Sequence, residues 1–334
     1  MTAIDVVVMA AGKGTRMKSS MPKVLHPLAG RALVQHVAQT AAKLGARQTV
    51  FVTGHGAEQV EAFLRQANPG QKMGFARQEP QLGTGHAVMQ AMPLLPDDGL
   101  VVVLSGDVPL IADSTLTRLT RACDGQKLAL LTVCPPDPTG YGRVVRNPQG
   151  QVQAIIEQKD ATEAQKAIGE IYSGIMAAPA GLLRGWLARL DNRNAQSEYY
   201  LTDVVAKAVT DGVEVVAIRS DDLAEVAGVN SPAQLAELER IHQRRQAEQL
   251  MHQGVRLLDP ANARAHNNRG IVLFDLGRVD LALACYDRAL ALQPDYAEAL
   301  NNRGNALRVL KRYSECAATF ARLFALDQIG RAHV

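Results

Sequence analysis

The stretch I-D-V-V-V-M-A-A-G-K-G-T-R-M-K-S-S-M-P-K-V-L-H-P-L-A-G, residues 4–30, decides the fold. Its apolar and β-branched start, residues 4–9, predicts a buried strand. The strand ends in small residues, Ala10, Ala11, Gly12 and Gly14, which leave backbone N–H groups bare. Bare N–H groups at the start of a helix bind anions, and nearby cations strengthen such a site. The cations here are Lys13, Arg16, Lys18 and Lys23, so we expect a bound polyphosphate.

Two familiar phosphate motifs do not fit this loop. A dinucleotide-binding G-x-G-x-x-G that starts at Gly12 would need glycine where Met17 stands. A P-loop that uses Gly12 and Lys13 would need glycine at Val7 and a hydroxyl residue at Gly14. Because a G-x-G after a strand is also common in plain turns, the loop alone leaves nucleotide binding and an ordinary turn both open.

The composition gives no sign of nucleic-acid or membrane binding. The 36 basic and 33 acidic residues give a formal net charge of only +3. The 4 cysteines show no C-x-x-C spacing, which favours reduced thiols over disulfides or a zinc site. No basic region precedes the first apolar run, and no apolar run approaches the roughly 18 residues of a membrane span. We therefore expect a cytoplasmic protein that binds neither nucleic acid nor membrane.

Helix and strand patterns alternate after the opening loop. Residues 32–44 and 86–92 are periodic as helices, whereas 49–53 and 100–104 are short apolar runs typical of strands. Such alternation predicts an α/β fold with a doubly wound, largely parallel sheet and ligands beyond the carboxyl ends of its strands. Asp107 follows the last of these runs and is a candidate Mg²⁺ ligand; the alternative is a carboxylate that caps the next turn.

The loop is one of several motifs that occur in a fixed order. M-A-A-G-K-G-T-R-M (9–17) and P-K-V-L-H (22–26) are followed by Q-L-G-T-G-H-A (81–87), G-D-V-P-L (106–110), D-P-T-G-Y-G-R (137–143), E-Y-Y-L-T-D (198–203) and G-V-N (228–230). Together they resemble the sugar-nucleotide pyrophosphorylases. The resemblance is strongest to the uridyltransferase half of bifunctional N-acetylglucosamine-1-phosphate uridyltransferase/glucosamine-1-phosphate acetyltransferase, and it extends from about residue 1 to 258.

This resemblance implies a Rossmann-like nucleotide-diphospho-sugar transferase fold and a reaction. The reaction is Mg²⁺-dependent uridylyl transfer from UTP to N-acetylglucosamine 1-phosphate, which serves peptidoglycan synthesis, cell wall biogenesis and cell shape. The catalytic residues it implies are Arg16 on the triphosphate, Lys23 on the reacting phosphates, and Asp107, which would hold the metal with Asn230. Since a sugar phosphate is already ionised at neutral pH, no general base is needed, and we expect His26, His55 and His86 to be structural.

The resemblance also implies a binding site for both substrates. Its residues are Met9, Ala10, Ala11, Gly12, Lys23, Gln78, Gly83, Thr84, Ser105, Gly106, Asp107, Gly142, Glu157, Tyr172 and Asn230. The amide of Gln78 would read uracil, and Gly142 and Glu157 would contact the sugar. Tyr172 stands where the family carries Asn, so a pyrophosphorylase for another sugar 1-phosphate remains an alternative.

The chain departs from the family after the first 229 residues and a helical arm at 230–257. L-D-P-A-N-A-R-A-H-N-N-R-G (258–270) recurs 34 residues later as L-Q-P-D-Y-A-E-A-L-N-N-R-G (292–304), which predicts two tetratricopeptide-like repeats at 258–326 and an unstructured tail at 327–334. The family's hexapeptide β-helix is missing, so we expect no acetyltransferase activity. The repeats suggest a protein partner or self-association. A natural fusion, a sequence-assembly chimera, and an adaptor with an inactive nucleotide domain all stay open.

Overall fold

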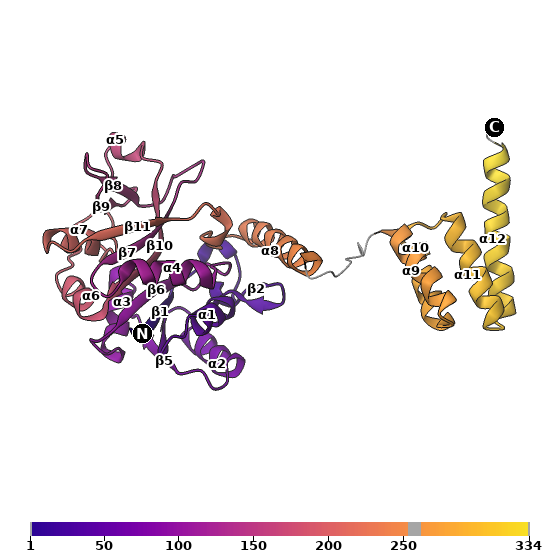
Figure 1. Cartoon of the computed structure of the whole chain (residues 1–334), viewed down its shortest axis with the longest axis horizontal. Helices are drawn as coiled ribbons and strands as arrows, with labels where there is room; N and C mark the ends of the chain where they lie inside the picture. Colours follow the sequence, from indigo (N-terminus) through magenta and orange to yellow (C-terminus); the bar gives the residue numbers. More distant parts are fainter. Residues whose placement is uncertain (1, 253–261, 333–334) are drawn as a thin grey trace. The chain divides into compact units, whose positions relative to one another are not determined.

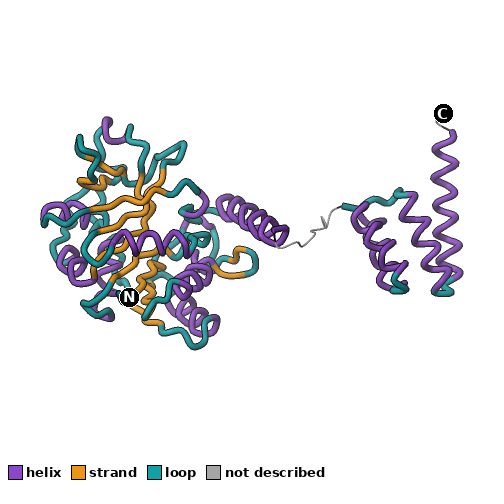
Figure 2. The backbone as a smooth tube through the Cα atoms, viewed as in Figure 1, coloured by secondary structure: helices purple, strands orange, loops and turns teal. Residues whose placement is uncertain are grey.

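The computed structural model describes residues 2–252 and 262–332. The chain folds as two compact units, 1–245 and 246–334 (Figure 1). Strands and helices alternate in the first unit, whereas the described part of the second contains helices and turns only (Figure 2). The expected boundary between arm and repeats, at 257 and 258, lies outside the described residues, and the division into domains stays a prediction.

A sheet of nine strands forms the centre of the first unit, counted over the described residues. Its parallel strands are β1 (Ile4–Ala10), β4 (Gln48–Thr53), β5 (Met73–Arg77), β6 (Leu100–Ser105), β7 (Leu128–Val133) and β11 (Val215–Arg219). Val6, Val7 and Val8 of β1 are fully buried, as expected for a strand covered on both faces. The predicted doubly wound, largely parallel α/β sheet is confirmed.

Three further strands complete the sheet. Strand β10 (Ile171–Pro179) runs antiparallel between β6 and β7, and β8 (Arg143–Arg146) pairs with both β10 and β9 (Val152–Ile156). The alternating pattern of residues 151–157 predicts a strand, which is β9, whereas β8 and β10 were not predicted. In β10 the pattern is interrupted by a register shift between Tyr172 and Met176, and Gly174 there has φ 87°. A short hairpin, β2 (Pro27–Leu28) and β3 (Arg31–Ala32), stands apart.

Helices cover both faces of the sheet. One buried cluster contains side chains of α3 (Thr84–Ala91), α6 (Ala180–Leu187) and α7 (Asp203–Thr210). The other contains side chains of α1 (Leu33–Lys43), α2 (Ala57–Ala67) and α4 (Asp113–Cys123). The short elements are α5 (Glu163–Lys166), η1 (Thr15–Met17), η2 (Lys23–Leu25), η3 (Met92–Leu94) and η4 (Leu223–Glu225). Long helix α8 (Pro232–His252) packs Leu235, Leu238 and Ile241 against a third cluster around Leu28.

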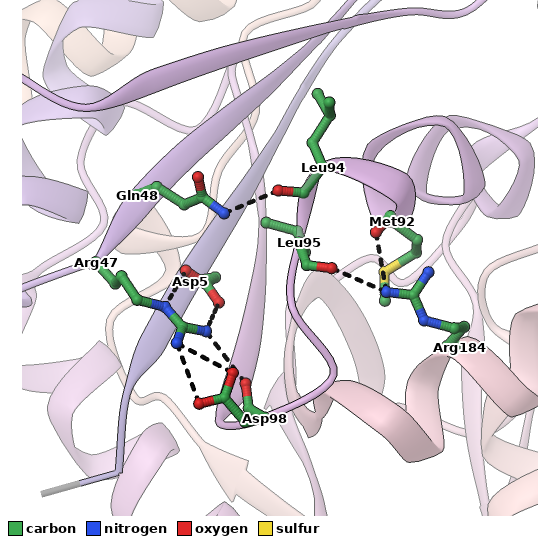
Figure 3. Close-up of polar contacts among 8 residues, drawn as sticks. All are labelled: Asp5, Arg47, Gln48, Met92, Leu94, Leu95, Asp98 and Arg184. Atoms are coloured by element: carbon green, nitrogen blue, oxygen red, sulfur yellow. Dashed lines mark hydrogen bonds and ion pairs between the residues drawn. The ribbon is translucent and has the colours of Figure 1, made fainter.

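A network of charges closes the amino-terminal edge of this sheet (Figure 3). Asp5, near the start of β1, is fully buried and accepts two hydrogen bonds from the Arg47 guanidinium, at 3.1 Å and 2.6 Å. Arg47 also donates to the Asp98 carboxylate just before β6, at 3.1 Å and 3.2 Å. The opposite edge, where β1, β4 and β6 end, is therefore the one available for a ligand.

The second unit contains two antiparallel helix pairs. They are α9 (Ala263–Asp275) with α10 (Val279–Leu292), and α11 (Ala297–Val309) with α12 (Tyr313–Ala332). Gly270 and Gly304 face the rings of Tyr286 and Phe320, where any Cβ would collide with the ring, so each glycine lets its helix pair approach closely. The Asn302 amide donates to buried Asn267 Oδ1 at 3.0 Å and joins the two pairs.

One expectation for this unit is wrong. Helix α12 continues to Ala332, where an unstructured tail was expected from residue 327. The helix continues through Gly330 because one glycine costs a helix only about 1 kcal/mol relative to alanine. In the part of the chain that the structure describes, no helix is long and apolar enough to cross a membrane.

Candidate active site

A cavity of about 930 Å³ opens at the carboxyl ends of β1, β4 and β6. The glycine-rich loop that leaves β1 forms one wall, and the segment from Arg77 to Thr84 forms another. Among the residues predicted from sequence, those that line it are Met9, Ala10, Ala11, Gly12, Lys23, Gln78, Gly83, Thr84, Ser105 and Asp107. Segments that are far apart in the sequence thus meet at one edge of the sheet.

Six predicted residues do not line this cavity, although five of them lie beside its walls or form a second cluster. Gly106 follows β6 and donates its N–H to Met9 O of β1 at 2.9 Å. Asn230 contacts Lys23, and Gly142, Glu157 and Tyr172 form a separate group described below. Arg16 is exposed on η1 and is not part of the lining. Its contact with the triphosphate stays a prediction.

The ammonium group of Lys23 lies between Asp107 and Asn230. It forms an ion pair with Asp107 Oδ2 and donates to Asn230 Oδ1 at 3.1 Å. The side chains of Lys23 and Asp107 are only 13% and 14% exposed. The Val229 N–H donates to Asp107 O at 2.9 Å, which brings the distant G-V-N segment to this point. The predicted trio of Lys23, Asp107 and Asn230 is therefore assembled in one place.

The two oxygens that converge on this ammonium suit a divalent cation. The Asp107 carboxylate and the Asn230 amide oxygen both contact the positive charge of Lys23. Mg²⁺ prefers one or two such oxygen ligands together with water and substrate phosphates. Among the described residues no group of three or more His, Cys, Asp or Glu could hold a metal. Asp107 and Asn230 thus fit a magnesium ion that shares its coordination with a phosphate-bearing substrate.

Polar groups on the other wall are held by hydrogen bonds to the backbone. Gln78 is almost fully buried, and its Nε2 donates to Gly83 O at 2.8 Å. Gln81 Nε2 donates to Ala11 O and ties this wall to the glycine-rich loop. Gln81 and His55 also line the cavity but were not predicted as site residues, and the His55 N–H donates to Ala11 O at 3.3 Å. Gln81 opens the motif Q-L-G-T-G-H-A, and that position was the available signal.

A second polar cluster joins Gly142, Glu157 and Tyr172. The Tyr172 N–H donates to Gly142 O at 2.9 Å, and a Cβ on Gly142 would lie 3.6 Å from the Glu157 carboxyl. Burial raises the pKa of Glu157. The hydrogen bond that Thr202 Oγ1 donates to Glu157 at 3.0 Å lowers this pKa, but by less. Burial and then the Glu157 charge raise the pKa of Tyr172 well above its usual value. The Tyr172 hydroxyl is buried and has no hydrogen-bond partner among the described residues.

Residues 6–192 match the MobA-like NTP transferase domain, and residues 270–308 match the TPR repeat. The chain belongs to the MobA-like NTP transferase family. It is a nucleotidyltransferase, and the expected occurrence of a TPR repeat in the C-terminal part is confirmed.

Curated relatives and solved structures agree with this family. The chain is 64% identical over 274 residues to the bifunctional protein GlmU of Polaromonas sp. strain JS666, covering 78% of this chain and 57% of that protein. It is 65% identical over 261 residues to the bifunctional protein GlmU of Paracidovorax citrulli, covering 78% and 55%. The chain therefore spans about half the length of these relatives.

Among solved structures, a UDP-glucose pyrophosphorylase complexed with UDP-glucose has a TM-score of 0.61 at 17% identity and covers 73% of this chain and 100% of that one. A nucleotidyl transferase from Methanothermobacter has a TM-score of 0.51 at 20% identity, covering 72% and 98%. At these identities the likeness supports the fold of this nucleotidyltransferase and nothing finer.

Proposed function

We propose that this nucleotidyltransferase transfers a uridylyl group from UTP to N-acetylglucosamine 1-phosphate in a magnesium-dependent reaction, giving UDP-N-acetylglucosamine and pyrophosphate. The observation that carries the proposal is the shared contact of Asp107 and Asn230 with the Lys23 ammonium, beside a cavity walled by bare backbone. The product would supply peptidoglycan synthesis in the cytoplasm, and thereby cell wall biogenesis and cell shape.

The chemistry of the reactants explains why cations surround this site. An oxygen of the sugar phosphate attacks the α-phosphorus of UTP, the bond from that phosphorus to the β-bridging oxygen breaks, and pyrophosphate leaves. The second pKa of a phosphomonoester is near 6, so the attacking oxygen is largely ionised at neutral pH. Two anionic reactants must therefore be aligned, and the negative charge on the leaving group must be neutralised.

The residues of this chain divide that task. Lys23 would neutralise the phosphates at the reacting centre, and Arg16 would contact the triphosphate. The backbone of residues 9–12 would approach the nucleotide closely, since Gly12 leaves open space where a side chain would stand. Asp107 and Asn230 would hold Mg²⁺, which when bound neutralises phosphate charge. Gly142, Glu157 and Tyr172 would contact the sugar.

Pyrophosphate release tests this function directly. The full chain is incubated with UTP, N-acetylglucosamine 1-phosphate and Mg²⁺, and release is compared with and without EDTA. We expect release that needs both substrates and stops with the chelator. No release with any sugar 1-phosphate would refute the proposed activity and favour an adaptor with an inactive nucleotide domain.

The identity of the sugar is a second question, because Tyr172 stands where asparagine was expected. Comparing kcat/KM for N-acetylglucosamine 1-phosphate and glucose 1-phosphate answers it, and a preference for glucose 1-phosphate would change the substrate but not the reaction. Acetyl transfer from acetyl-CoA to glucosamine 1-phosphate is predicted to be absent, and the same preparation can be assayed for it. The TPR repeats are proposed to bind a protein partner or a second copy of the chain.

A further inference from the structure

A side chain behind the cavity wall fixes the group proposed to read the base. His86 on α3 does not line the cavity, but its Nδ1 lies 3.4 Å from Gln78 Nε2. Its other nitrogen, Nε2, lies 3.0 Å from the amide of Gln90, and its ring packs against Tyr199 with centroids 6.2 Å apart. His86 thus connects the amide of Gln78 to helix α3 and to the segment that contains Tyr199.

The hydrogen bonds fix which end of the Gln78 amide faces inward. Gly83 O can only accept a hydrogen bond, and Gln78 Nε2 lies 2.8 Å from it, so the nitrogen end must point that way. The same NH₂ group has a second hydrogen, and His86 Nδ1 is the acceptor within reach. Nothing in the part of the chain that the structure describes donates to Gln78 Oε1. The oxygen is therefore the end that Gln78 offers to a ligand.

This arrangement requires one tautomer of His86. If Nδ1 accepts from Gln78, the ring hydrogen is on Nε2, and the Gln90 amide must turn its oxygen toward it. One hydrogen bond to Gly83 fixes the position of the Gln78 nitrogen, whereas two bonds also fix the plane of the amide. The second bond, to His86, thereby sets the direction in which Oε1 points.

We propose that His86 is a positioning residue for base recognition: it holds Gln78 so that Oε1 accepts a hydrogen bond from the N3–H of an imide base. This inference rests on the proposed function and identifies the class of base. Uracil has a donor at N3, whereas cytosine has an acceptor there, which an amide oxygen repels. The site should therefore favour UTP over CTP, and His86 should maintain that preference without touching either nucleotide.

Two substitutions separate positioning from packing. His86→Phe keeps a ring against Tyr199 but removes the acceptor, whereas His86→Asn keeps an acceptor near the position of Nδ1 and loses the ring. We expect His86→Phe to raise KM for UTP about tenfold with little change in kcat, and to lower the UTP-to-CTP ratio of kcat/KM by a similar factor. His86→Asn should recover most of the UTP preference. A purely structural role would give the opposite order, since Phe would preserve the packing better.

Assays of the wild-type enzyme separate the proposed function from the role of His86. No turnover with UTP would overturn the proposed function and this inference together. Turnover with equal kcat/KM for UTP and CTP would overturn this inference and leave uridylyl transfer standing. A clear UTP preference in the wild type that His86→Phe leaves intact would overturn only the role of His86. If His86→Phe does not fold, His86→Asn decides, because a loss of UTP preference in a folded His86→Asn protein would contradict the role of an acceptor at this position.

Discussion

The two edges of the central sheet both contain a carboxylate paired with a cation, but the pairs differ in kind. At the amino-terminal edge, Asp5 is fully buried and Arg47 binds both of its oxygens (Figure 3). At the carboxyl-terminal edge, Asp107 is paired with Lys23, and both side chains line the cavity. At the amino-terminal edge the carboxylate of the ion pair is buried, whereas at the carboxyl-terminal edge the ion pair lies where a ligand in the cavity can contact it.

The choice of cation matches this difference. A guanidinium binds a carboxylate through two parallel hydrogen bonds in a rigid plane, which fixes the Asp5 contact. An ammonium is a compact charge on a flexible stem, so it can exchange one anionic partner for another. We infer that the Arg47 pair stabilises the fold and that the Lys23 pair serves the reaction. Substitutions on the two edges should then affect different measurements.

The largest effect is expected from Asp107→Asn. The substitution keeps the shape of the side chain but removes the charge that pairs with Lys23 and that would hold Mg²⁺. Turnover in the pyrophosphate-release assay should fall about 10²- to 10³-fold, by comparison with the loss of other groups that stabilise charge in a transition state. The thermal midpoint should change little, because Lys23 keeps its bond to Asn230. Turnover close to that of the wild type would refute the catalytic assignment of Asp107.

Arg47→Met should produce the opposite result. It leaves the Asp5 carboxylate buried without a cation, and breaking a buried pair from one side should lower the thermal midpoint by roughly 10 °C. Turnover at 25 °C should stay within about twofold of the wild type, because the site lies at the other edge. Adding Asp5→Val should recover much of the lost stability, since it removes the unpaired charge. A large loss of turnover in the folded Arg47→Met variant would contradict the inference that the Arg47 pair serves stability and not the reaction.

A glycine pair tests how closely the Lys23 position depends on its surroundings. Gly14 has φ 59°, and a Cβ there would lie 2.5 Å from Lys23 Cβ; Gly30 has φ 78° with nothing within 4 Å. Alanine at either position should cost about 1 kcal/mol of stability through backbone strain. Only Gly14→Ala should also displace Lys23 and lower turnover, about tenfold. Equal turnover in the two variants would show that Lys23 tolerates displacement.

The sequence predicted the carboxyl-terminal edge of the sheet, where the cavity lies, better than the amino-terminal edge. Apolar runs of β-branched residues identify β1 and β6, and because parallel strands end at one edge, Asp107 could be placed near the glycine-rich loop from pattern alone. Asn230 could not be placed there from pattern alone. Its contact with Lys23 depends on a backbone hydrogen bond between Val229 and Asp107, which are far apart in the sequence. Only the family resemblance linked the two.

The sequence signals were weaker at the amino-terminal edge of the sheet and in the cluster of Gly142, Glu157 and Tyr172. Arg47 lies between a helix and a strand as one of many basic residues, and nothing local shows that it reaches Asp5 and Asp98. Strand β10 escaped prediction because glycine and a register shift interrupt its pattern. The burial of Tyr172, at 6% exposed, therefore could not be anticipated. Periodicity reports which residues are buried within an element, but not which element lies next to it.

The smallest predicted effect concerns Tyr172. Its hydroxyl has no hydrogen-bond partner among the described residues, in contrast to the paired charges of Asp5 and Arg47 at the amino-terminal edge. Tyr172→Phe removes a buried hydroxyl that has no partner among the described residues, so the free energy of unfolding should rise by about 1 kcal/mol. If that hydroxyl binds the sugar, KM for the sugar phosphate should rise about fivefold with kcat unchanged. Tyr200→Phe is the matched control, because the Tyr200 hydroxyl donates to Asp160 at 3.2 Å and its removal should destabilise the protein. A stabilised Tyr172→Phe with unaltered KM would show that the hydroxyl is unpaired without contacting the sugar.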